Sequence, residues 1–238
     1  MSATSTDPVT CTMEDGVAVV RLDDGKVNVI SHQVIELVHG ALDEALASGS
    51  SVAVIGREGK LSAGFDLTEM TAGPSHAAAL VGAGGRLLMR IYGHPQPVVL
   101  GVTGHALAAG ALLALSCDTR IGGDGPAKIG LNETAIGMGL PIFAVELARD
   151  RLSPTAFTAA TIQGQVFDPA GAVVAGYLDR LVPLDQVEGQ ARDDAGRLAQ
   201  LRRGAVSHTK GRARQRTIDH ILATLAEDIA ATGMPEPR

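Results

Sequence analysis

Residues 96–120, QPVVLGVTGHALAAGALLALSCDTR, decide the fold of this chain. They predict a short apolar strand over Val98–Val102, a turn rich in glycine and alanine, and a helix that begins near Ala108 and ends near Cys117. Only small side chains line the turn, so a ligand can approach its backbone closely. The first N–H groups of a helix have no acceptor within the helix and are free to bind negative charge.

A second loop of the same kind lies upstream, at residues 61–67 (LSAGFDL). It stands between a strand-like run at residues 51–56 and a helix-like run that follows. Two such corners, each with exposed amide groups, could bind a single oxyanion.

Both loops carry motifs of a known family. Residues 62–67 (SAGFDL) and 104–110 (GHALAAG) resemble the S-A-G-x-D-L and N-G-x-A-x-G-G-G motifs of the crotonase superfamily, the enoyl-CoA hydratase and isomerase family. Four further segments match patterns of that family in the same order: 118–121 (DTRI), 129–133 (IGLNE), 161–167 (TIQGQVF) and 175–183 (AGYLDRLVP). The resemblance covers roughly residues 10–185.

The alternation of strands and helices independently predicts an α/β fold. Strands are expected at residues 16–22, 51–56, 98–102 and 118–122, and helices at residues 32–47, 74–93, 141–151 and 153–161. Ser31 is the expected N-cap of the first helix. The resemblance implies a crotonase-like core of repeated β-β-α units that wind as a spiral over residues 1–185. It also implies a C-terminal helical appendage over residues 186–238, which would cover the active site or help to build a trimer or a dimer of trimers.

Composition narrows the class of protein. The chain has 238 residues, 45% of them hydrophobic, which is enough for one substantial domain or one domain with an appendage. It has no Trp and a net charge of −6, which argues against a platform for stacking nucleic-acid bases and against attraction to anionic lipid. The two cysteines have no metal-type spacing, and neither a secretion signal nor a membrane-spanning run is recognisable. We therefore expect a cytoplasmic protein with no nucleic-acid or membrane partner.

The resemblance implies roles for both loops. The backbone N–H groups of Phe65 and Ala109 would form an oxyanion hole that stabilises a thioester enolate, with Ala63, Gly64 and Gly110 shaping the substrate-binding loops. Ala109 replaces the usual glycine, which keeps the N–H group but adds a methyl group. Asp66 is expected to fix its own loop rather than to contact substrate.

Glu133 is the candidate catalytic acid and base, because it stands where the family has a catalytic glutamate. A carboxyl group in an apolar pocket has a raised pKa, which suits proton transfer at neutral pH. A glutamate that follows a strand can equally be an ordinary surface residue or a helix cap. Glu146 is a weaker candidate for a second acid.

Leu112 is the departure from the family pattern that matters most for function. Hydratases of the family have a second glutamate at this position, and leucine can neither activate water nor protonate C2. A Δ3-Δ2 enoyl-CoA isomerase needs only one glutamate, so isomerase activity is favoured. An atypical hydratase and an inactive acyl-CoA binding protein remain as alternatives.

The implied substrate is a coenzyme A thioester, with no tightly bound cofactor. Lys210, in a basic C-terminal segment, is the expected contact to the coenzyme A phosphates, although such a segment can also be a solvated helix face. The histidines show no metal-ligand pattern. A serine hydrolase and a nucleotide-dependent dehydrogenase are disfavoured, because neither motif occurs with the required spacing.

Overall fold

The computed structural model describes residues 7–231. The elements in chain order are β1 (Val9–Glu14), β2 (Val17–Leu22), β3 (Val29–Ile30), α1 (His32–Ser48), β4 (Ser51–Ile55), β5 (Gly59–Ser62), β6 (Gly64–Phe65), α2 (Leu67–Thr71), α3 (Pro74–Tyr92), β7 (Val98–Val102), β8 (Gly104–Leu107), α4 (Ala109–Ser116), β9 (Thr119–Asp124), β10 (Ile129–Gly130), η1 (Thr134–Ile136), α5 (Ile142–Arg151), α6 (Pro154–Thr161), α7 (Pro169–Ala175), β11 (Arg180–Pro183), η2 (Leu184–Gln186), α8 (Val187–Ala199) and α9 (Arg203–Ala231).

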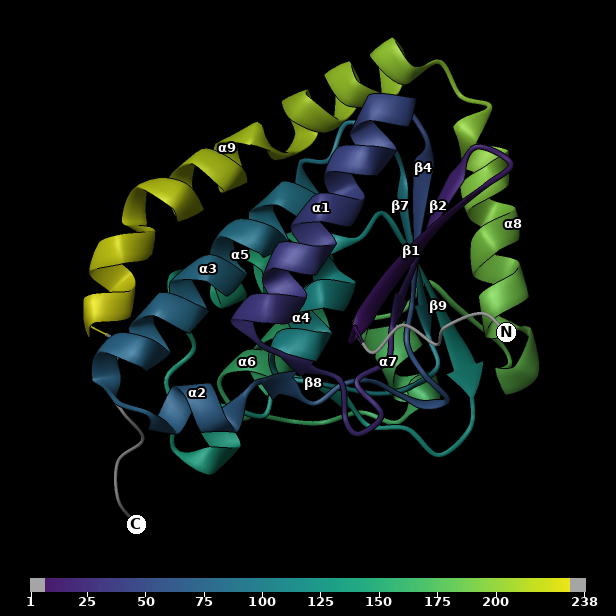
Figure 1. Ribbon diagram of the computed structural model, residues 1–238. Helices are drawn as coiled ribbons and strands as arrows, with labels where there is room; N and C mark the ends of the chain where they lie inside the picture. The colour runs from purple at the N-terminus through teal and green to yellow at the C-terminus, as the bar shows by residue number, and fades with distance from the viewer. Residues whose placement is uncertain (1–6, 232–238) are drawn as a thin grey trace.

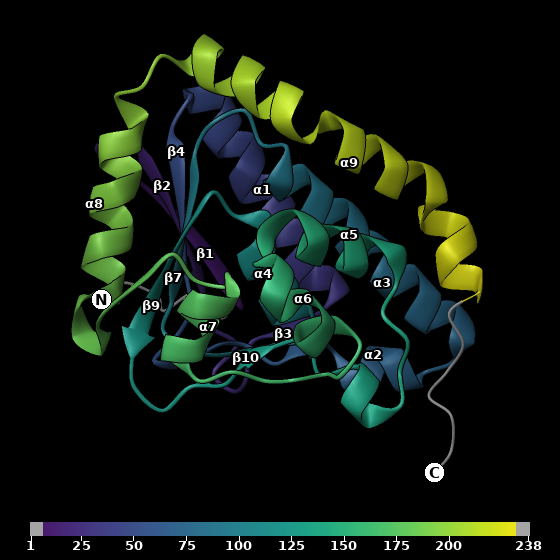
Figure 2. The ribbon, with the colours of Figure 1, turned by 180° about the vertical axis from the view of Figure 1, so that it is seen from behind.

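A six-stranded sheet forms the centre of the molecule, in the order β1-β2-β4-β7-β9-β11. The pair β1 and β2 is antiparallel, and the other neighbours are parallel. Helices cover both faces: α8 lies on one, and α1, α3 and α4 lie on the other (Figures 1 and 2). Because side chains alternate along a strand, β4 sends Ala53 and Ile55 toward α8, and Val52 and Val54 into the larger core on the opposite face.

Short strands follow the long ones and form two small parallel sheets, β10-β8-β5 and β3-β6. Each of β2, β7 and β9 is thus followed by one short strand and β4 by two, and a helix comes next in every case, which confirms the repeated β-β-α core. The sequence predicted only turns where β5, β6 and β8 lie. These strands are too short to show a pattern of their own and are stabilised by pairing with segments far away in the chain.

Most of the predicted elements are present with small shifts at their ends. Ser31 caps α1 as expected, its side-chain oxygen accepting a hydrogen bond from the N–H of Val34 at 3.2 Å. Strand β1 and helix α7 were not predicted. Residues 1–6 lie outside the described residues; they belong to the N-terminus that was interpreted as lacking a secretion signal. Residues 232–238 of the predicted appendage also lie outside them.

The C-terminal helices differ in how they pack. Helix α8 covers a sheet face through Ala191 and Ala195. The division of the chain at residue 185 stays a prediction. Helix α9 crosses the outside of α3 and α5 as a long strap (Figure 1). It approaches α3 closely at Gly85, where the absence of a side chain makes room for Leu225. A Cβ atom built on Gly85 would lie only 2.9 Å from a methyl carbon of Leu225.

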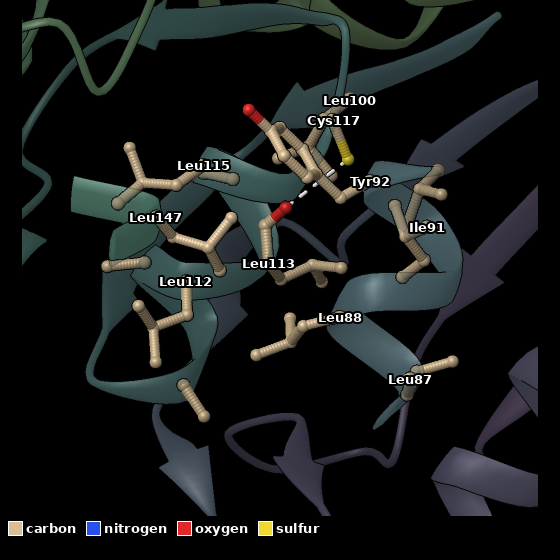
Figure 3. Close-up of a cluster of buried hydrophobic side chains, with 14 of the residues drawn as sticks. Leu87, Leu88, Ile91, Tyr92, Leu100, Leu112, Leu113, Leu115, Cys117 and Leu147 are labelled. Carbon is tan, nitrogen blue, oxygen red and sulfur yellow. Dashed lines mark hydrogen bonds between the residues drawn. The ribbon is translucent and has the colours of Figure 1, made fainter. Parts of the chain in front are cut away.

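Helix α4 is the centre of the core. All of its residues are buried, which is typical of a helix that is apolar on every side. Figure 3 shows its leucines between α3 and Leu147 of α5, with the thiol of Cys117 donating to the carbonyl of Leu113 at 3.3 Å.

An ionic cluster of Asp118, Lys210 and Arg214, in which Lys210 is buried and the other two are partly buried, fastens α9 to the end of α4. The Lys210 ammonium donates to one Asp118 carboxylate oxygen at 2.6 Å, and Arg214 donates to the other at 2.6 Å. Lys210 also donates to the carbonyl oxygens of His94 and Gln96, at 2.7 and 2.9 Å. Each cation thus has partners inside the protein, as buried charges require. Within residues 7–231, no helix combines the length and hydropathy that a bilayer-spanning segment needs.

Replacing Asp118 with alanine should lower the free energy of unfolding by about 3 kcal/mol or more, because the buried Lys210 and the partly buried Arg214 lose their shared counter-charge. Urea denaturation monitored by circular dichroism measures this change. The matched control is Glu146→Ala, which breaks a 3.4 Å pair with the exposed Arg149 and should change stability by less than about 0.5 kcal/mol. Equal effects of the two substitutions would contradict a structural role for the cluster.

Candidate active site

The two small-residue loops meet, and glycine is what allows the contact. A Cβ atom built on Gly110 would lie 2.5 Å from the carbonyl oxygen of Ser62. A Cβ atom built on Gly64 would lie 2.9 Å from the Cβ of Ala108 and 3.5 Å from the backbone nitrogen of Ala109. Strand β6 and the first turn of α4 are therefore in van der Waals contact.

Two backbone amides on this contact face away from the regular hydrogen-bonding network. The N–H of Asp66 donates to the carbonyl of Ile30 in β3 at 3.1 Å. Alternate amides of an extended strand point to opposite sides, so the N–H of the preceding residue, Phe65, points away from β3. Ala109 is the first residue of α4, so its N–H has no acceptor within the helix. Asp66 caps α2 by accepting from the N–H of Thr68 at 2.7 Å, as the sequence predicted.

Ala108, which precedes α4, has an unusual backbone conformation with φ = 51° and ψ = −124°. Positive φ is unfavourable for a residue with a Cβ atom, and strain of this kind costs on the order of 1–3 kcal/mol. Its N–H donates to the carbonyl of Gly130 at 3.1 Å, which helps to hold it in place. No sequence pattern at this position predicts such a strained turn.

An apolar cavity of about 350 Å³ lies beside the two loops. Phe65, Leu112 and Glu133 form its wall on the loop side. The rest comes from helices α2, α3, α5 and α9 and from the segment between η1 and α5. Among the described residues that line it, Glu133 alone has an ionisable side chain. The volume falls within the usual range for small-molecule sites, and the single carboxyl group is the polar feature expected to direct chemistry there.

Glu133 is held in a desolvated position. Its backbone carbonyl accepts hydrogen bonds from the N–H groups of Ile136 and Met138, both at 3.0 Å, which fixes the segment around η1. The side-chain oxygen Oε2 is buried and has no hydrogen-bond partner among the described residues. Burial raises the pKa of Glu133 to about 7, so the carboxyl group can both accept and release a proton near neutral pH.

The structure brings three of the predicted site residues, Glu133, Phe65 and Leu112, to one cavity. Ala109 does not line this cavity and instead lines a smaller apolar space in the core. Gly64 and Gly110 serve the contact between the loops, and Ala63 is exposed and does not line the cavity.

The structure does not bring Lys210 or Glu146 to the cavity. Lys210 is only 8% exposed and its ammonium group is used within the ionic cluster, so it is not available to coenzyme A phosphates in this arrangement. Its burial follows from α9 packing against the end of α4, a contact between distant segments that a basic sequence does not indicate. Glu146 pairs instead with Arg149.

Several cavity residues were not recognised from the sequence, among them Ala78, Ile229 and Ala230. Each is an apolar residue whose sequence neighbourhood carries no motif, so tertiary contact alone reveals its place. In the part of the chain that the structure describes, no group of three or more histidine, cysteine or acidic residues could hold a metal ion.

Comparison with known proteins identifies the family of this chain. The family model for enoyl-CoA hydratase/isomerase matches residues 12–231. The human mitochondrial enoyl-CoA delta isomerase 1 is 32% identical over 219 residues, which are 90% of this chain and 72% of that protein. A putative enoyl-CoA hydratase of Thermus thermophilus is 33% identical over 195 residues, 77% of this chain and 73% of that protein.

The fold is equally well matched. The crystal structure of an enoyl-CoA hydratase/isomerase family protein from Pseudomonas syringae superposes with a TM-score of 0.93 and 41% identity, covering 96% of this chain and 99% of the other. The β-β-α core, the two loops and the cavity thus occur in a chain that belongs to the enoyl-CoA hydratase/isomerase family and has the crotonase fold.

Proposed function

We propose that this protein is a Δ3-Δ2 enoyl-CoA isomerase in which Glu133 is the only proton carrier. The observation that carries the proposal is that Glu133 is the single ionisable side chain among the described residues that line the cavity, whereas Leu112 lines it without a polar atom. Moving a double bond within an acyl chain requires one proton to leave and one to return, and a single carboxyl group can perform both transfers.

The thioester oxygen of the substrate would be bound by the N–H groups of Phe65 and Ala109. Removal of a proton from C2 places negative charge on this oxygen, and fixed amide donors stabilise such a charge by about 2.7–4 kcal/mol each. The contact between β6 and α4 supports this assignment, because it draws the two amide-bearing corners together.

In the proposed reaction the ionised carboxylate of Glu133 takes a proton from C2 of a 3-enoyl-CoA. The electron pair of that C–H bond forms the C1–C2 double bond of a dienolate that keeps its C3–C4 double bond, and the π electrons of the thioester carbonyl move to its oxygen. The neutral carboxylic acid then gives the proton to C4, which regenerates the carboxylate and yields the conjugated 2-enoyl-CoA. No cofactor is required, and the apolar walls keep water from the dienolate.

Two alternatives belong to the same fold. An enoyl-CoA hydratase with an atypical site would need a second group to activate water, and Leu112 supplies none. A catalytically inactive acyl-CoA binding protein would keep the cavity but not the proton transfer. The name of the human relative favours isomerase activity, whereas the Thermus relative is named a putative hydratase. The homotrimer or dimer of trimers and the cytoplasmic location stay predictions from the sequence.

Replacing Glu133 with glutamine should lower kcat for conversion of 3-enoyl-CoA to 2-enoyl-CoA by about 10²–10⁴-fold, because the amide cannot carry the proton. The absorbance of the conjugated thioester reports the reaction. Turnover that is unchanged in Glu133→Gln would rule out this role. A wild-type protein that binds acyl-CoA in calorimetry but turns over neither 3-enoyl- nor 2-enoyl-CoA would favour the inactive binder.

The same substitution should stabilise the folded protein at pH 8. The pKa of Glu133 is raised from 4.5 to about 7, so the folded state binds more protons than the unfolded state between these values and loses stability as the pH rises through them. Glutamine removes this loss of stability, which is about 3 kcal/mol. Thermal unfolding of both proteins at pH 4 and pH 8 tests the expectation: the two should be alike at pH 4, and a less stable variant at pH 8 would contradict it.

The pH dependence of kcat/KM should report the same group. The free enzyme needs Glu133 ionised, so kcat/KM should rise with pH and reach half of its plateau near pH 7 rather than near the ordinary value of 4.5. A profile that is already flat between pH 5 and pH 8 would argue against a desolvated glutamate as the base.

A further inference from the structure

The ring of Phe65 separates two apolar spaces. Phe65 belongs to the wall of the 350 Å³ substrate cavity and also to the wall of a space of about 20 Å³ in the core. The second space is lined only by glycine, alanine, aliphatic side chains and Phe65 itself, including Leu22, Val38 and Leu87. A space of this size and composition holds no polar group that would keep a water molecule.

The ring of Phe65 occupies the space that a side chain at Gly84 of α3 would fill, and we call this position the seat of the ring. A Cβ atom built on Gly84 would lie 2.3 Å from Cε1 and 2.5 Å from Cζ of Phe65, distances that no real contact tolerates. Gly84 lies in the middle of a 19-residue helix, where glycine is less favourable than alanine. The close approach of the ring is a physical reason for a glycine at this position.

We propose that the Phe65 side chain is the partition that sets the length of the acyl chain the enzyme accepts. With the ring seated on Gly84, the acyl group is confined to the cavity between α2, α3, α5 and α9. Without the ring, the two spaces join, and the added room has walls suited only to hydrocarbon. This inference rests on the proposed function for the identity of the ligand as an acyl-CoA, whereas the partition itself rests on the two cavities and on Gly84.

The test compares wild type with Phe65→Ala on linear 3-enoyl-CoA substrates of six and twelve carbons. The substitution keeps the backbone N–H and removes the ring. The ratio of kcat/KM for the longer to the shorter substrate should rise about tenfold or more, since one methylene group in an apolar pocket changes kcat/KM by about 10–200-fold. A ratio within twofold of wild type would overturn the proposal.

Two further variants distinguish the effect of removing the Phe65 partition from the effect of loosening the core in general. Leu87→Ala removes a buried side chain (Figure 3). This side chain lines the inner space but not the substrate cavity, so its removal should leave the ratio unchanged. Gly84→Ala adds a methyl group that displaces the ring from its seat toward the substrate, so the ratio should fall. A Gly84→Ala enzyme with the wild-type ratio, or a Leu87→Ala enzyme with the ratio of Phe65→Ala, would contradict the inference.

The proposal stays testable if Phe65→Ala does not fold or if the proposed reaction is wrong. Phe65→Leu keeps more of the packing and should give a smaller rise of the same sign. If wild type converts no 3-enoyl-CoA, the proposed function fails, and calorimetry with hexanoyl-CoA and dodecanoyl-CoA replaces the kinetic assay. The ratio of the two dissociation constants should then shift toward the longer ligand in Phe65→Ala, and an unshifted ratio would refute the partition independently.

Discussion

The contact between strand β6 and the first turn of helix α4 is the constraint on which the rest of the site depends. Gly110 stands so close to the Ser62 carbonyl, and Gly64 so close to Ala108, that a Cβ atom at either position would force the backbones apart. Separation by even an ångström would change the relation between the amides of Phe65 and Ala109. Fixed donors are effective only when they need not reorganise as charge develops. The packing of these two backbone segments therefore determines where the amide donors lie, before any side chain contributes to the site.

The cavity beside this contact is almost entirely apolar, which explains why one carboxyl group is sufficient to define its chemistry. Glu133 has no partner for Oε2 among the described residues, and burial without a hydrogen bond is unfavourable for the charged form. The folded protein tolerates this loss of stability because the segment around η1 is fixed by its backbone hydrogen bonds. The strained backbone of Ala108 is a second local loss of stability at the same site. Unfavourable features that persist together at one site are characteristic of functional regions.

The sequence predicted the features that depend on local physical chemistry. Ser31 caps a helix because its hydroxyl is beside free N–H groups, and Pro74 begins α3 because proline suits the first turn. Glu133 was found through its place in a motif, and the structure adds the cavity around it. Strand β8 was missed because its stability comes from pairing with β5 and β10, segments that local patterns do not connect. Lys210 was interpreted as a ligand contact for the same reason: its basic neighbourhood suggests a solvated surface, whereas tertiary packing buries it against Asp118.

Residues 96–120, the stretch that decides the fold, also connect the amide of Ala109 with the ionic cluster at Asp118. Helix α4 begins at the amide of Ala109 and is followed by Asp118, which binds Lys210 and Arg214 of α9. From Lys210 to Ile229, α9 extends about 28 Å and reaches the cavity that α4 borders through Leu112. The carboxylate that anchors α9 therefore helps to fix a wall of the cavity although it lies far from the reacting atoms. A rigid helix can transmit such a constraint because its packing against α3 leaves little room for sliding, as the close contact of Gly85 with Leu225 indicates.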